Sequence, residues 1–105
     1  MTPRALLIEE LRAAISWLNA RRDRDTMERF GSDIAQATLA LTGLIRCLAH
    51  PEVASGAQRE AASAIQALNF IGDPPLEGVL ADIEELANRA MRFALGDGDA
   101  CNRCE

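Results

Sequence analysis

The three cysteines and the single histidine form two pairs with the same spacing, Cys47-x-x-His50 and Cys101-x-x-Cys104. Thiolates and imidazoles are the ligands that zinc prefers, and two ligands three residues apart can reach one tetrahedral ion. The spacing therefore indicates a structural zinc site that joins all four residues. In the alternative interpretation, Cys47 is a small core residue, His50 ends a helix, and the CxxC pair is a reduced tail.

Enzyme chemistry finds little support among the remaining polar residues. The chain has 11 Arg and no Lys, which removes Schiff bases and lysine general bases. Glu9-Glu10 and Glu84-Glu85 are adjacent pairs, whose members point about 100° apart on a helix and so form no carboxylate dyad. His50 has no orienting partner nearby in the sequence. We therefore expect a non-enzymatic protein without a catalytic residue.

One segment resembles part of an enzyme family. Residues 11–22, Leu-Arg-Ala-Ala-Ile-Ser-Trp-Leu-Asn-Ala-Arg-Arg, are similar to the first helix of the all-helical chorismate mutases. The resemblance implies a small carboxylate-bearing substrate held by Arg12 and Arg22. That family also has a lysine further along, which this chain lacks, and Ser16 or Asn19 stands where the family has Asp. Because of these departures, we do not predict a chorismate mutase.

The hydrophobic pattern is helical throughout, because apolar residues recur at steps of three and four and no stretch alternates as a strand does. We predict four helices with recognisable ends. The predicted helices lie between Thr2-Pro3 and Arg24, between the Asp25 cap and His50-Pro51, between Ala57 and the Gly72 cap, and between Asp73-Pro74-Pro75 and Gly96.

Two of these helices have well-defined apolar faces. The second has a heptad pattern, in which Gly31-Ser32 predicts a kink or a break with Ser32 as a new N-cap. The heptad positions are Met27, Phe30, Ile34, Ala37, Leu41, Leu44 and Leu48. In the fourth helix, the residues predicted to be buried are Leu76, Val79, Leu80, Ile83, Leu86, Ala87, Ala90 and Phe93.

Short connections between helices favour antiparallel neighbours. The sequence therefore predicts an all-α, compact antiparallel bundle of about four helices over residues 1–96, with an acidic, cysteine-containing tail over residues 97–105. No apolar run approaches the roughly 20 residues of a membrane span, and the start of the chain does not resemble a signal peptide. We expect a cytoplasmic protein that does not contact a membrane.

The net charge of −5 is concentrated in the last third of the chain. Residues 1–70 have eight Arg and eight acidic residues, whereas residues 71–105 have eight acidic residues and three Arg. This distribution disfavours direct nucleic-acid binding, which needs a concentrated basic surface. It favours a protein partner with a basic surface, contacted through Asp82, Glu84 and Glu85 of the fourth helix.

The first helix has a second apolar strip beside its core face, formed by Leu6, Ala13 and Trp17. We interpret this strip as a contact for a protein partner or a second copy, with Trp17 as the anchor. The alternative is that Trp17 covers the end of the bundle. Homodimerisation is expected, because a small bundle with an extra apolar edge gains stability by pairing.

Together these features predict a small acidic helical protein that binds and modulates a protein partner, by inhibiting or sequestering it. Anti-activators, antitoxins and phage-encoded inhibitors share this size and charge, which is analogy and not a motif. The alternative is a small domain stabilised by the structural zinc site of Cys47, His50, Cys101 and Cys104.

Overall fold

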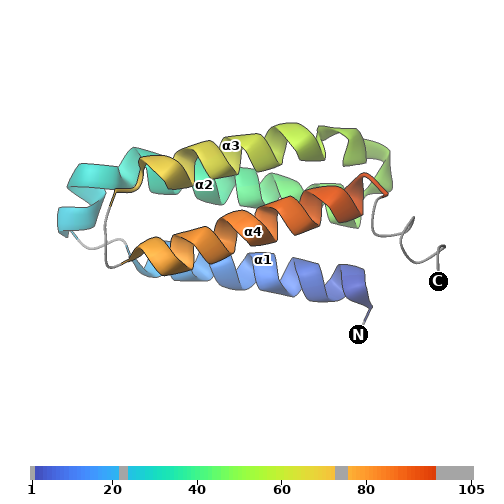
Figure 1. Cartoon of the computed structure of the whole chain (residues 1–105), viewed down its shortest axis with the longest axis horizontal. Coiled ribbons are helices and arrows are strands. Elements are labelled where there is room, and N and C mark those ends of the chain that lie inside the picture. Colours follow the sequence, from blue (N-terminus) through green and yellow to red (C-terminus); the bar gives the residue numbers. More distant parts are fainter. Residues whose placement is uncertain (1, 22–23, 73–75, 97–105) are drawn as a thin grey trace.

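The computed structural model describes residues 2–21, 24–72 and 76–96. These ranges contain four α-helices and one 3₁₀-helix and no strand, which confirms the all-α antiparallel bundle (Figure 1). The bundle measures 47 × 23 × 21 Å. Its elements are α1 (Pro3–Ala20), α2 (Arg24–Ala49), η1 (Pro51–Gly56), α3 (Ala57–Phe70) and α4 (Glu77–Ala94).

Helix α1 begins as its sequence predicts. The Thr2 hydroxyl accepts a hydrogen bond from the backbone N–H of Ala5 at 3.1 Å, and Pro3 occupies the first turn. This contact satisfies one of the backbone donors that a helix start leaves without an internal partner. At the other end, the backbone N–H of Arg21 donates to the carbonyl of Leu18 at 3.0 Å.

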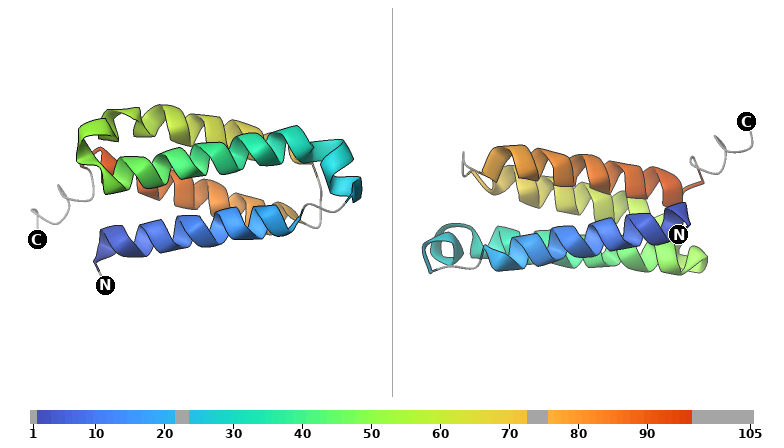
Figure 2. Two further views of the ribbon diagram at one scale, coloured as in Figure 1. Left: turned by 180° about the vertical axis from the view of Figure 1, so that it is seen from behind. Right: turned by 90° about the horizontal axis from the view of Figure 1, so that it is seen from below.

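Helix α2 is continuous across Gly31-Ser32, so Ser32 does not begin a new helix. Figure 2 shows the first turns of α2 directed away from the axis of the rest of the helix, as expected of a kink at a Gly-Ser pair. The predicted seam is confirmed from Ile34 to Leu48, all of whose apolar members are buried. Burial of Met27 was wrong: its side chain is 37% exposed, because it lies before the bend.

The ends of the other helices follow the predicted residues in part. His50 is extended and Pro51 begins η1, so α2 ends where the proline requires. Helix α3 ends at Phe70, and the chain leaves it through an extended Ile71. Gly72 has no positive φ, so the predicted glycine cap at Gly72 is wrong; Gly96 (φ +94°) does form such a cap. Asp73, Pro74 and Pro75 lie outside the described residues.

All four α-helices contribute to one apolar core. Small residues line the contact between α2 and α3, including Ala40 on α2 and Ala61 and Ala64 on α3, all 0–2% exposed. One predicted core residue of α4 was wrong: Val79 is 38% exposed, although Ile83 and Leu86 on the same side of the helix are buried. The most deeply buried large side chains are Leu11, Leu18, Ile34, Leu41, Leu44, Leu48 and Leu68.

Two leucines of α2 provide a matched test of this core. Leu44 is 0% exposed, whereas Leu39 is 66% exposed on the same helix. We predict that Leu44→Ala lowers the free energy of unfolding by about 2–5 kcal/mol through lost burial and a residual cavity. Leu39→Ala should change it by less than about 0.5 kcal/mol. Urea unfolding followed by circular dichroism measures both values, and equal losses would contradict the packing described.

Candidate functional site

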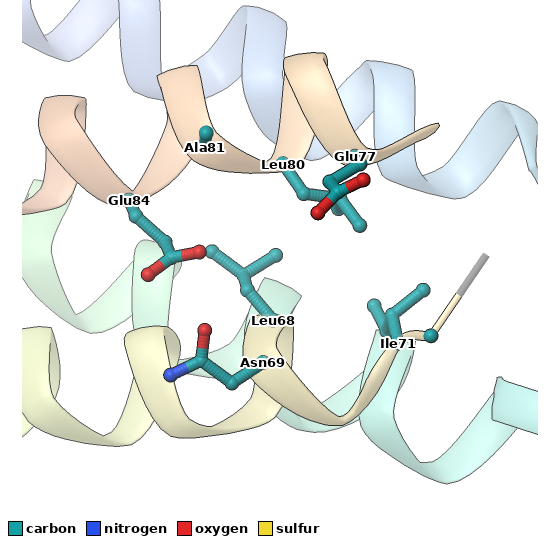
Figure 3. Close-up of a pocket in the computed structure, with 8 residues that line it drawn as sticks. Leu68, Asn69, Ile71, Glu77, Leu80, Ala81 and Glu84 are labelled. Atoms are coloured by element: carbon teal, nitrogen blue, oxygen red, sulfur yellow. The ribbon is translucent and has the colours of Figure 1, made fainter. Parts of the chain in front are cut away.

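A surface hollow of about 350 Å³ lies between the end of α3 and the first half of α4 (Figure 3). Its floor is apolar, because Leu68, Ile71 and Leu80 are each at least 95% buried and line it. Clefts that combine an apolar surface with a few placed polar groups are where proteins bind ligands or partner side chains. The lining consists of Leu68, Asn69, Ile71, Gly72, Glu77, Leu80, Ala81 and Glu84.

Two carboxylates border this floor on the α4 side. Glu77, Ala81 and Glu84 lie at positions i, i+4 and i+7, so they share one edge of α4. Glu77 is in the first turn, where the helix dipole favours a negative charge. In the amide orientation that satisfies both groups, Asn69 Nδ2 donates to both carboxylate oxygens of Glu84, at 3.2 and 3.3 Å. In this orientation the contact links α3 to α4.

The described lining of the hollow combines apolar side chains with carboxylates. None of its eight lining residues is a Ser, Cys, Lys or His, and its ionisable members are the two glutamates. A carboxylate rim above an apolar floor complements a cationic group attached to an apolar body, such as an Arg or Lys flanked by large apolar residues. We name this surface the α3/α4 groove, defined by the eight lining residues.

A second hollow, of about 290 Å³, lies between α2 and α3. Here Gln36 Nε2 donates to Ser63 Oγ at 2.7 Å, so two of its polar groups satisfy each other. Asp33 is the one ionisable residue of its lining. Phe70 borders this hollow and is 63% exposed, and Leu39 lies one turn from Gln36. Both are exposed apolar side chains, and the homodimer stays a prediction.

The acidic residues predicted as a partner contact point in different directions. Glu84 faces α3 and belongs to the groove. Asp82 and Glu85 are exposed and lie about 160° and 100° from Glu84 around the helix. The structure therefore separates Glu84 from Asp82 and Glu85, and pairs it instead with Glu77.

The strip on α1 is interrupted. Leu6 is 51% exposed and Ala13 is exposed, but Trp17 is partly buried against the core. The guanidinium of Arg21 lies 4.8 Å from the centre of the Trp17 ring, a cation–π contact. Between Leu6 and Ala13, Glu10 forms an ion pair of 3.2 Å with an arginine of α4. Part of the strip thus supports the bundle itself.

The predicted zinc ligands are described only in part, since Cys101 and Cys104 lie outside the described residues. Cys47 is buried, and its thiol donates to the backbone carbonyl of Val53 at 3.5 Å. His50 is exposed, with Nδ1 3.5 Å from a carboxylate oxygen of Glu52. Within the described ranges, no three His, Cys, Asp or Glu residues gather as a metal site.

The environment of Cys47 favours the neutral thiol. Burial raises its pKa most, the negative charge of Glu60 raises it further, and Arg46 lowers it in part. A zinc ligand must be a thiolate. Zinc binding here would therefore require the Cys47 thiol to leave the Val53 carbonyl and lose its proton, and the zinc site stays a prediction.

The structure describes one of the two arginines that suggested a carboxylate-binding enzyme. Arg12 is exposed and pairs with Glu9, one turn away, at 3.0 Å. Arg22 lies outside the described residues.

Comparisons with protein-family models, with curated proteins and with solved structures found no match to this chain. In the part of the chain that the structure describes, no helix is both long enough and apolar enough to cross a membrane. The candidate site therefore rests on its geometry.

Sequence reasoning found Glu84 but missed the other residues of the groove. The i, i+4, i+7 spacing of Glu77, Ala81 and Glu84 was visible and could have indicated a shared edge. Asn69 and Ile71 had no such signal, because their place in the groove depends on how α3 packs beside α4.

The raised pKa of Cys47 gives a test in a variant whose other two cysteines are replaced by Ser. We predict that Cys47 is alkylated by iodoacetamide more slowly than a free cysteine at pH 8, because less thiolate is present. Glu60→Gln should speed the reaction by removing a charge that raises the pKa.

Glu85→Gln, on the exposed side of α4, is the control and should leave the alkylation rate unchanged. The raised pKa of Cys47 also determines how this thiol makes stability depend on pH. Because the pKa is higher in the folded chain than in the unfolded chain, the free energy of unfolding falls as the pH rises above the pKa of the unfolded thiol. A slower reaction in Glu60→Gln would contradict the assigned cause.

Proposed function

We propose that this chain is a non-enzymatic binding protein that holds a basic, partly apolar segment of a protein partner in the α3/α4 groove and thereby inhibits or sequesters that partner. The observation that carries the proposal is the groove itself. Its buried apolar floor lies beside two carboxylates on one edge of α4.

The charge of the chain supports the same proposal. The net charge of −5 lies in residues 71–105, which include α4. An acidic surface attracts a basic partner at long range and increases the rate of encounter, while the apolar floor supplies contact area. Glu84 is held by Asn69 before any partner arrives, which lowers the entropy that the side chain loses on binding.

By analogy of size and charge, the proposed role is that of a small cytoplasmic regulator, such as an anti-activator, an antitoxin-like protein or a phage-encoded inhibitor. Binding of the groove to an exposed basic segment would block that segment from its other contacts. No catalytic step is part of the proposal.

Site-specific photocrosslinking tests it in cells or in a lysate of the native host. A benzoylphenylalanine replaces Ala81 in the groove, or Ala13 in the α1 strip, and a third exposed alanine, Ala35 on α2, is the control. We expect one defined protein to crosslink from position 81, and the yield to fall when Glu77→Gln and Glu84→Gln are added.

The alternatives give different results. If a partner crosslinks from position 13 and not from position 81, the α1 strip and not the groove is the binding surface. The absence of any defined product from position 81, with the variant folded by circular dichroism, would contradict the proposal.

A further inference from the structure

We infer that the segment bound in the α3/α4 groove is an amphipathic α-helix that presents cationic side chains at positions i and i+7, with a large apolar residue between them at i+3 or i+4. The inference rests on the proposed function and names the partner element that the groove fits.

The spacing of the two carboxylates matches two turns of an α-helix. Glu77 and Glu84 are seven residues apart on one edge of α4, which places their attachment points about 10 Å apart along the helix axis. A helix lying along this edge repeats its own side chains at the same interval, two turns apart. Cations at i and i+7 of that helix therefore meet both carboxylates.

An extended segment does not match this interval. Side chains on one face of a strand recur at about 6.6 or 13 Å, because successive residues point to opposite faces and each rises about 3.3 Å. Neither value equals the separation of Glu77 and Glu84. The carboxylate spacing thus matches the repeat of a helix more closely than that of a strand.

The surface between the two carboxylates leaves room for an apolar side chain of the partner. Ala81 lies midway between Glu77 and Glu84 and is exposed, so no large side chain of α4 covers this point. Below it lie Leu68 and Leu80, both at least 95% buried. An apolar side chain one turn from the first cation of the partner helix enters the hollow here, as anchors do in helix-in-groove recognition.

One of the two carboxylates, that of Glu84, has a partner on α3. With the Asn69 amide in the orientation that satisfies both groups, its nitrogen donates to both oxygens of Glu84, at 3.2 and 3.3 Å, and each oxygen retains capacity to accept from a cation. Glu84 is also partly buried, so an ion pair formed there is less exposed to solvent than one on an open helix surface.

Two peptides of identical composition test the inference. Both are alanine-rich, carry a fluorophore and have leucine at i+3 and i+4. One has arginine at i and i+7, on one face, and the other has arginine at i and i+9, on opposite faces. In fluorescence anisotropy at low salt, we expect the i, i+7 peptide to bind more tightly.

Single variants of the chain locate the contact. Glu77→Gln and Glu84→Gln should each weaken binding of the i, i+7 peptide by about two- to fivefold, the range for partly exposed ion pairs. Glu85→Gln, which removes an exposed carboxylate next to Glu84 on another face, is the matched control and should have no effect.

Several outcomes would overturn the inference: equal affinities for the two peptides, equal losses in the Glu84→Gln and Glu85→Gln variants, or no binding of either peptide. The proposed function fails separately. If a partner crosslinks from position 81 through a non-helical segment, the bound segment is not a helix, but the groove remains the binding site. If no partner crosslinks from position 81, the groove is not the binding site.

Discussion

The close contact between α2 and α3 is the constraint on which the rest of the structure depends. Small residues face each other there, with Ala40 on α2 and Ala61 and Ala64 on α3, all nearly fully buried. At Gly43, an added Cβ would meet the Glu60 side chain, which reaches across from α3 and would have to move aside. Small residues let two helices approach closely, and the other helices pack against this α2–α3 pair.

The opposite side of α3 is built differently, and the α3/α4 groove results. There α3 meets α4 partly through longer polar side chains, with Asn69 reaching across to Glu84. Toward the end of α3 the two helices leave a hollow of about 350 Å³ instead of closing on each other. The same helix thus has one edge closed by alanines and borders the hollow beside α4 on its other side.

Much of the fold could be predicted from local signals. The Thr2 cap, the proline after His50 and the Gly96 stop act within a few residues, and the structure confirms them. The predictions that failed depend on three-dimensional context. Met27 has the right spacing for the core, but it lies in the first turn of α2, where Figure 2 shows the helix leaving the axis of its later turns, and it is exposed.

The candidate site was less predictable than the core. The acidic character of α4 was clear, but charge alone grouped Glu84 with Asp82 and Glu85, which point elsewhere. Only the packing of α3 beside α4 shows that Glu84 pairs with Glu77 above a floor that includes Ile71. The periodicity of one helix identifies its buried face, whereas a groove belongs to two helices at once.

Hydrogen–deuterium exchange of the chain, alone and with the partner captured from position 81, tests the central claim most directly. The account predicts slower exchange in the end of α3 and the first half of α4, over residues 68–72 and 77–84, with α1 unchanged. Protection centred on Leu6 to Trp17 of α1, or around Leu39 and Phe70, with none over residues 77–84, would contradict it.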